Sequence, residues 1–126
     1  MGNRELSKRP HARLAVWQEA MGLVEMIYGL SSKFPDAERF GLTSQMRRAA
    51  VSVPSNIAEG AARRSTPEYQ RFLSIARGSL SELDTHVQIA ARLGYGATNH
   101  EVSDCIDSVF AKLTALMNAI RKRGAA

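Results

Sequence analysis

The side chains that could carry covalent or metal chemistry in this sequence are few and stand far apart. They are the histidines His11, His86 and His100 and the single cysteine Cys105. Hydrolysis or group transfer needs a nucleophile, a base and an orienting group close together, and no spacing here suggests such a group. A lone thiol forms no intramolecular disulfide and is a poor start for a zinc site. We therefore expect no catalytic residue, no bound metal and no cofactor.

Asn56 and Glu59 are the other candidates for chemistry, in the stretch from Arg47 to Arg64. They would need a histidine or cysteine in the same helix, and none occurs there. Glu59 and Arg63 are spaced i,i+4 in the order that favours an ion pair, which explains both residues without catalysis. Pro54 predicts a bend in this helix, with a neighbouring serine or asparagine able to bond the carbonyl that it frees.

Basic side chains are the more informative group, because the chain has a formal net charge of +5. Arranged arginines and lysines bind phosphates without any base-reading element. The candidates for nucleic-acid binding are Arg47, Arg48, Arg63, Arg64, Arg121, Lys122 and Arg123, and residues 1–13 form a further basic stretch. The alternative is that these are ordinary solvated charges. Tyr95, beside two glycines, is either a base-stacking residue or a structural one.

The spacing of apolar residues predicts four helices, at about residues 12–33, 43–64, 66–93 and 99–123. A hydroxyl cap, a proline and an early glutamate at Ser65–Glu68 predict a helix start, and Thr98 and Glu101 have the spacing of a capping box. Short linkers place successive helices antiparallel. We predict one all-α domain over residues 1–126, an antiparallel up-down-up-down four-helix bundle.

The first helix carries two apolar seams, more than one bundle core needs. One seam contains Leu14, Trp17, Met21, Val24 and Tyr28, and the other contains Val16, Ala20, Leu23, Ile27, Leu30 and Phe34. The third helix also has a second, mixed face with Ile75, Gly78, Glu82, Ile89 and Leu93. Surplus apolar faces on two helices predict contacts with another subunit, although a solvated face is the alternative for the third helix. Gly60 belongs to the core face of the second helix and predicts close helix packing.

Several segments together resemble a known family. They are L-A-V-W-Q-E-A (14–20), F-P-D-A-E-R-F-G-L-T-S-Q-M-R-R-A (34–49), S-V-P-S-N-I-A-E-G (52–60), E-Y-Q-R-F-L (68–73) and A-R-G-S-L-S-E-L (76–83). The chain resembles the small four-helix-bundle proteins encoded by intervening sequences in bacterial 23S ribosomal RNA genes, a group similar to the accessory variability determinant of diversity-generating retroelements. The resemblance implies a homopentameric barrel without enzymatic activity. It also implies binding of RNA or DNA through basic residues and, in the retroelement branch, a reverse transcriptase as partner.

Two functions follow from these observations. The first is a non-enzymatic, basic homo-oligomer that binds RNA or DNA through surface arginines. The second is an interaction scaffold or accessory factor that docks a partner such as a reverse transcriptase, and a stand-alone bundle with another role is also open. The sequence contains no run of about 20 apolar residues that would span a membrane and no secretion signal, so we expect a cytoplasmic protein.

Overall fold

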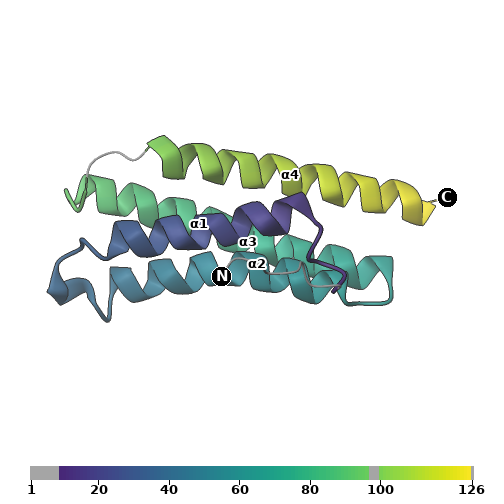
Figure 1. The fold of residues 1–126 in the computed structure, drawn as a ribbon, viewed down its shortest axis with the longest axis horizontal. Helices are drawn as coiled ribbons and strands as arrows, with labels where there is room; N and C mark the ends of the chain where they lie inside the picture. Colours follow the sequence, from purple (N-terminus) through teal and green to yellow (C-terminus); the bar gives the residue numbers. More distant parts are fainter. Residues whose placement is uncertain (1–8, 97–99, 126) are drawn as a thin grey trace, which may run out of the picture.

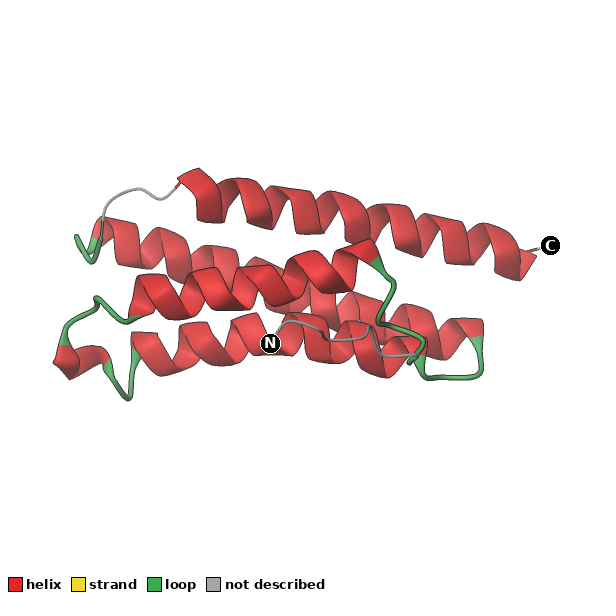
Figure 2. Ribbon diagram, viewed as in Figure 1, coloured by secondary structure: helices red, strands yellow, loops and turns green. Residues whose placement is uncertain are grey.

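The computed structural model of the protein describes residues 9–96 and 100–125. Within these ranges the chain forms the helices α1 (Ala15–Ser31), α2 (Leu42–Ala61), α3 (Thr66–Arg92) and α4 (His100–Ala125), with a 3-10 turn η1 (Asp36–Glu38) and no strand. The helices run alternately up and down along one long axis (Figures 1 and 2). The predicted all-α class and the order of the four helices are confirmed.

Two helix boundaries differ from the prediction by three residues, and the others differ by at most two. α1 begins at Ala15 rather than near residue 12, because residues 10–13 form turns in which the amide of Ala12 donates to the carbonyl of Arg9. α2 ends at Ala61, three residues early, since the chain must extend before Ser65. The hydroxyl of Ser65 accepts the amide of Glu68 and starts α3 where predicted. The predicted cap at Thr98 lies outside the described residues.

The core is lined by one of the two seams of α1. Val16, Ala20, Leu23, Ile27 and Phe34 are buried, together with residues of the other three helices such as Met46, Leu80, Leu83, Val109 and Leu113. Each large buried side chain of this kind stabilises the fold by about 1.5–3 kcal/mol. On the other seam, Met21 and Tyr28 are exposed. Leu14, Trp17 and Val24 of the same seam are partly buried and pack against the core, so only part of this seam faces outward. A subunit contact at its exposed part stays a prediction.

α2 and α3 approach each other closely at Gly60. A Cβ atom at Gly60 would lie 3.1 Å from a ring carbon of Tyr69 and 2.9 Å from the Cβ of Phe72, and the second distance is shorter than real Cβ atoms show. The predicted close packing at Gly60 is confirmed. Farther along the pair, the hydroxyls of Ser52 and Ser79 form a hydrogen bond of 2.7 Å across the two helices. The S-V-P-S-N-I-A-E-G segment therefore begins and ends with residues that pack against α3.

α2 continues as one helix through Pro54. The carbonyl that loses its helical donor to this proline is that of Ala50. The side chains nearby bond the next two carbonyls instead: the Ser55 hydroxyl donates to Val51 at 2.8 Å, and the Asn56 amide donates to Ser52 at 2.8 Å. Asn56 is therefore occupied with the backbone of its own helix, which agrees with a structural role for this residue.

The turn η1 between α1 and α2 was not predicted from the sequence, and it holds the start of α2. One carboxylate oxygen of Glu38 accepts the amide of Leu42 at 3.1 Å, and the other accepts the hydroxyl of Tyr95 at 2.9 Å. The Tyr95 ring lies 5.7 Å from that of Phe34, between centroids. The hydrogen bond to Glu38 raises the pKa of Tyr95. Tyr95 thus joins the α3–α4 connection to η1, and its structural reading fits better than base stacking.

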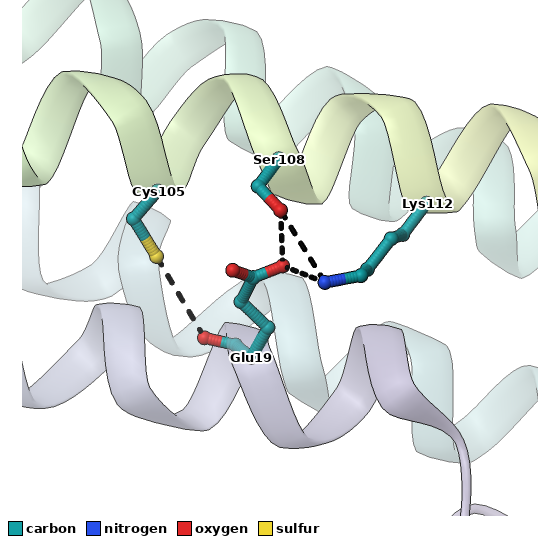
Figure 3. A network of polar contacts seen from close by, with 4 residues as sticks. All are labelled: Glu19, Cys105, Ser108 and Lys112. Carbon is teal, nitrogen blue, oxygen red and sulfur yellow. Dashed lines mark hydrogen bonds and ion pairs between the residues drawn. The ribbon is translucent and has the colours of Figure 1, made fainter.

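A polar cluster between α1 and α4 was also missed by the sequence (Figure 3). The Oε1 atom of Glu19 accepts hydrogen bonds from the hydroxyl of Ser108 at 2.6 Å and from the Nζ of Lys112 at 2.7 Å. Burial opposes the charge of Glu19, but the bonds from Lys112 and Ser108 outweigh it, so the pKa of Glu19 lies below its ordinary value. This cluster ties the middle of α4 to α1.

Cys105 lies one turn before Ser108 on the same face of α4. Its thiol is buried, and its sulfur lies 4.0 Å from the carbonyl oxygen of Glu19. Burial, and to a lesser degree the negative charge of Glu19, raise the pKa of Cys105. Cys105 is therefore a thiol packed between α4 and α1.

Candidate nucleic-acid interface

The up-down arrangement brings two of the basic clusters to one end of the bundle. The end of α2, the start of α3 and the end of α4 lie together at the right of Figure 1, and α1 begins on the same side. A Cβ atom at Gly124 would lie only 3.1 Å from Cγ2 of Thr66. The last turn of α4 is therefore in contact with the first turn of α3. We call Arg63, Arg64, Arg121, Lys122 and Arg123 the basic end, and Arg13 precedes α1 on this side.

Within the basic end, the arginines differ in how far they are engaged by the protein. Arg63 forms the predicted ion pair with Glu59 at 2.9 Å, and its guanidinium lies 4.7 Å from the ring centroid of Phe72. The guanidinium of Arg71 lies 5.5 Å from the same centroid, so two guanidiniums make cation–π contacts with one buried ring. Arg64, by contrast, is exposed in the turn between α2 and α3. Arg64 is thus the better candidate for contacts outside the protein.

The cations at the end of α4 are exposed as well. Arg121 donates to the side-chain oxygen of Asn118 at 3.0 Å, which orients its guanidinium along the helix surface. Arg123 lies near enough to Tyr69 for its charge to oppose the effect of burial, which raises the pKa of that phenol. Two clusters that are distant in the sequence therefore form one positively charged surface.

The opposite end of the bundle carries both signs of charge. η1 has Asp36 and Glu38, and the first turn of α4 has Glu101. Lys33 and Arg92 lie at the ends of α1 and α3 on the same side. At the basic end, five cations stand against Glu59 and Glu68, so this end has a net positive charge that can attract a polyanion.

Arg47 and Arg48 do not belong to the basic end. α2 ends at Ala61, fourteen residues after Arg47, so Arg47 lies about 21 Å from that end of the helix at the rise of an α-helix. The Nε of Arg47 donates to the hydroxyl of Ser31 at 2.8 Å, and its guanidinium lies 4.4 Å from the ring centroid of Tyr28. Arg47 therefore joins α2 to the end of α1. Phosphate binding, which the sequence predicted for Arg47, would compete with these contacts.

A groove between α1 and α2 surrounds these residues. It has a volume of about 680 Å³, and its lining includes Tyr28, Arg39, Phe40, Arg47, Arg48 and Val51. Phe40 is 87% exposed, and the guanidinium of Arg39 lies 5.4 Å from its ring centroid. The sequence analysis missed Phe40, although a large aromatic residue inside a polar turn was the available signal. Exposed aromatics beside arginines are typical of protein-binding surfaces.

The second face of α3 is exposed, as the two-faced pattern indicated. Ile75, Ile89 and Leu93 all have large exposed fractions, and an added Cβ at Gly78 would meet nothing within 4 Å. Among the described residues, Gly78 therefore makes no close helix contact, because this face turns away from the core. A contact there with another subunit stays a prediction.

The histidines lie in three separate places. The His11 ring lies tilted against that of Trp17 with 4.8 Å between centroids, and His100 begins α4. His86 is only 6% exposed in the last third of α3. The Nε2 of His86 lies 3.6 Å from a carboxylate oxygen of Glu82. Over residues 9–96 and 100–125, no cluster of three histidine, cysteine or acidic residues could hold a metal ion.

Comparisons with known proteins add one finding about relationship. A family model described as 23S rRNA-intervening sequence protein matches residues 12–119. The match spans all four helices and ends just before the basic residues of α4. No curated protein matches the chain. In the described part of the chain, no helix combines the length and apolarity that crossing a membrane requires.

Proposed function

The chain belongs to the 23S rRNA-intervening sequence protein family, and from this premise we propose that it is a non-enzymatic homo-oligomer that binds RNA or DNA through its basic end. The contacts are made to phosphates by exposed cations, chiefly Arg64, Arg121, Lys122 and Arg123. The histidines lie in three separate places and the thiol of Cys105 is buried, which supports a binding role over a catalytic one.

One observation carries this proposal: the contact between the first turn of α3 and the last turn of α4. It places Arg64 in the same surface as the cations of α4. Neutralising phosphates with several neighbouring cations releases condensed counterions, which gives affinity that falls steeply with salt. A cluster assembled from two helices can do this, whereas isolated surface arginines contribute little.

Self-association strengthens the same argument. Exposed apolar side chains on α1 and α3, such as Met21, Tyr28, Ile75, Ile89 and Leu93, support a subunit contact. An oligomer repeats the basic end in every subunit, so that one nucleic acid can touch several copies at once. The resemblance to the family implies five subunits, and we include the pentamer in the proposal.

The test combines mass with binding. Light scattering gives the oligomer mass, and fluorescence anisotropy with labelled RNA and DNA at low and moderate salt gives affinity. We expect Arg64→Gln/Arg123→Gln to weaken binding strongly. Lys33→Gln/Arg92→Gln at the opposite end removes the same charge and is expected to weaken it little. Equal losses in both variants would mean that net charge alone acts, and absence of binding by the wild-type oligomer would reject the proposal.

The groove between α1 and α2 favours a second candidate function, the docking of a partner protein. Its exposed Phe40 and the neighbouring Arg39 and Arg48 have the composition of a binding hot spot. The resemblance implies a reverse transcriptase as one such partner. Phe40→Ser separates the two functions, because it is expected to abolish partner capture and to leave nucleic-acid affinity unchanged. Loss of nucleic-acid binding in Phe40→Ser would contradict that separation.

A further inference from the structure

A groove between the first half of α3 and the last half of α4 opens beside the basic end. It has a volume of about 750 Å³, and its lining includes Thr66, Gln70, Arg77, Thr114, Met117 and Arg121. Sites for small organic ligands commonly have volumes of about 300–1,000 Å³. The groove is therefore large enough for a group of nucleotide size, and it is continuous with the cations of the basic end through Arg121.

The groove is lined by apolar side chains and by two side-chain amides. Met117 and Pro67 supply apolar surface. The amide nitrogen of Gln70 donates to the backbone carbonyl of Met117 at 2.7 Å, which ties α3 to α4 and orients the Gln70 amide. The side-chain oxygen of Asn118 accepts Arg121, which leaves the amide N–H groups of Asn118 as donors. Oriented amides over an apolar surface suit the edge and the face of a nucleobase.

Cations stand at both ends of this groove. Arg121 lies toward the basic end, and Arg77 lies toward the middle of the bundle, where its guanidinium is 6.0 Å from the ring centroid of Phe110. Thr114 and Arg121 are two helical turns apart on α4, about 10 Å. An apolar middle with a positive charge on either side matches a nucleotide, whose flat base is flanked along the strand by phosphates.

We propose that this groove holds one unpaired nucleotide of the strand whose phosphates cross the basic end. The inference rests on the proposed function and narrows its substrate to single-stranded or frayed nucleic acid. A base paired inside a duplex has its faces stacked and its pairing edge occupied, so it cannot enter the groove without being extruded. A single strand therefore binds more tightly than a blunt duplex of the same length.

The experiment fills the groove and compares two forms of nucleic acid. Thr114→Trp places an indole in the groove, and Ala115→Trp places the same side chain at an exposed neighbouring position outside it. Affinities are measured by anisotropy with a labelled 12-nucleotide single strand and with the blunt duplex of the same sequence. We expect Thr114→Trp to weaken single-strand binding about tenfold, the effect of losing one base contact, and to leave duplex binding and the melting temperature unchanged. Ala115→Trp is expected to behave as wild type.

The outcomes separate this inference from the proposed function. Equal losses for single strand and duplex, or no loss for either, would overturn the groove site while leaving the basic end intact. If the wild-type protein binds neither the single strand nor the duplex, both proposals fail. Adenosine monophosphate is the second probe, and we expect it to compete with the single strand only weakly. Competition at concentrations close to those of the strand would assign the groove to a free nucleotide and overturn the strand proposal.

Discussion

Arg47 on α2 covers the ring of Tyr28 on α1, with its guanidinium carbon 4.4 Å from the ring centroid and its Nε bonded to the hydroxyl of Ser31. That hydroxyl in turn donates to the carbonyl of Ile27 at 2.7 Å. A side chain of the type that contacts phosphates is here part of a helix–helix junction. The neighbouring Arg48 is exposed.

We predict that Arg47→Ala destabilises the fold by about 1–2 kcal/mol, because it removes a hydrogen bond to a buried hydroxyl and a cation–π contact. Arg48→Ala is the matched control on the same helix, and a change within about 0.5 kcal/mol is expected for it. Urea unfolding of both variants measures the difference. Equal destabilisation would show that the Tyr28 contact contributes nothing.

The glycines Gly60 and Gly78 are expected to respond in opposite ways to the same substitution. Gly60→Ala should cost about 1–3 kcal/mol, because its Cβ would overlap Phe72. Gly78→Ala has open space around it and should stabilise α3 by up to about 1 kcal/mol through helix propensity. Thermal unfolding tests both. Gly78→Leu, followed by light scattering, then asks whether this face is a subunit contact, since a lower mass with an unchanged melting temperature would indicate one.

Stability at acid pH should depend on Glu19. Its folded pKa lies below the ordinary value of 4.5, so its contribution is complete above that value and is lost as the pH falls through the lower, folded pKa. The side chains of Glu19 and Lys112 are partly exposed, and we expect the contribution to be below about 1 kcal/mol. Urea unfolding of wild type and Glu19→Gln at neutral pH and at about pH 3 should show a gap that closes on acidification. A gap independent of pH would contradict this account.

Tyr95 is expected to support the fold and to leave nucleic-acid binding alone. Tyr95→Phe removes the hydrogen bond to Glu38 and should lower the melting temperature. In an ultraviolet titration, the phenolate of Tyr95 should form above the ordinary pKa of 10.0. Anisotropy with labelled RNA completes the test, and a clear loss of affinity in Tyr95→Phe would restore the base-stacking interpretation.

The salt dependence of binding should count the cations that touch phosphates. For each phosphate contact, the slope of log affinity against log salt is about −0.9 on duplex DNA and about −0.7 on single strands. Arg64→Gln should therefore make the slope shallower by nearly one unit on a duplex. Arg63→Gln should change it less, because Glu59 already pairs with Arg63. An unchanged slope in Arg64→Gln would remove that residue from the interface.

The helices could be predicted from the sequence because their signals are local. The seam of Val16, Ala20 and Leu23 and the cap at Ser65 act over a few residues, and both appear as expected. The seams of α1 could not be ranked in advance, since both have the same apolar spacing and only packing separates them. The turn η1 was missed because its main contact is made by Tyr95, far along the chain.

The residues of the candidate site could be predicted from the sequence, but their arrangement in space could not. Every basic candidate was visible in the sequence, but the contact between Thr66 and Gly124 that unites two clusters is a property of the tertiary fold. The same holds for Arg47, whose partners Tyr28 and Ser31 lie on another helix. The number of charges can be counted from a sequence, whereas the direction in which each charged side chain points depends on the residues that contact it in the fold.

Because Cys105 is buried against Glu19, the reactivity of its thiol reports how often α4 separates from α1. A thiol with a raised pKa, covered by α1, reacts with an alkylating reagent only after the two helices separate. The rate of labelling therefore reports the free energy of that local opening. Since α4 carries the cations of the basic end, labelling would slow whenever a bound polyanion holds this helix in place.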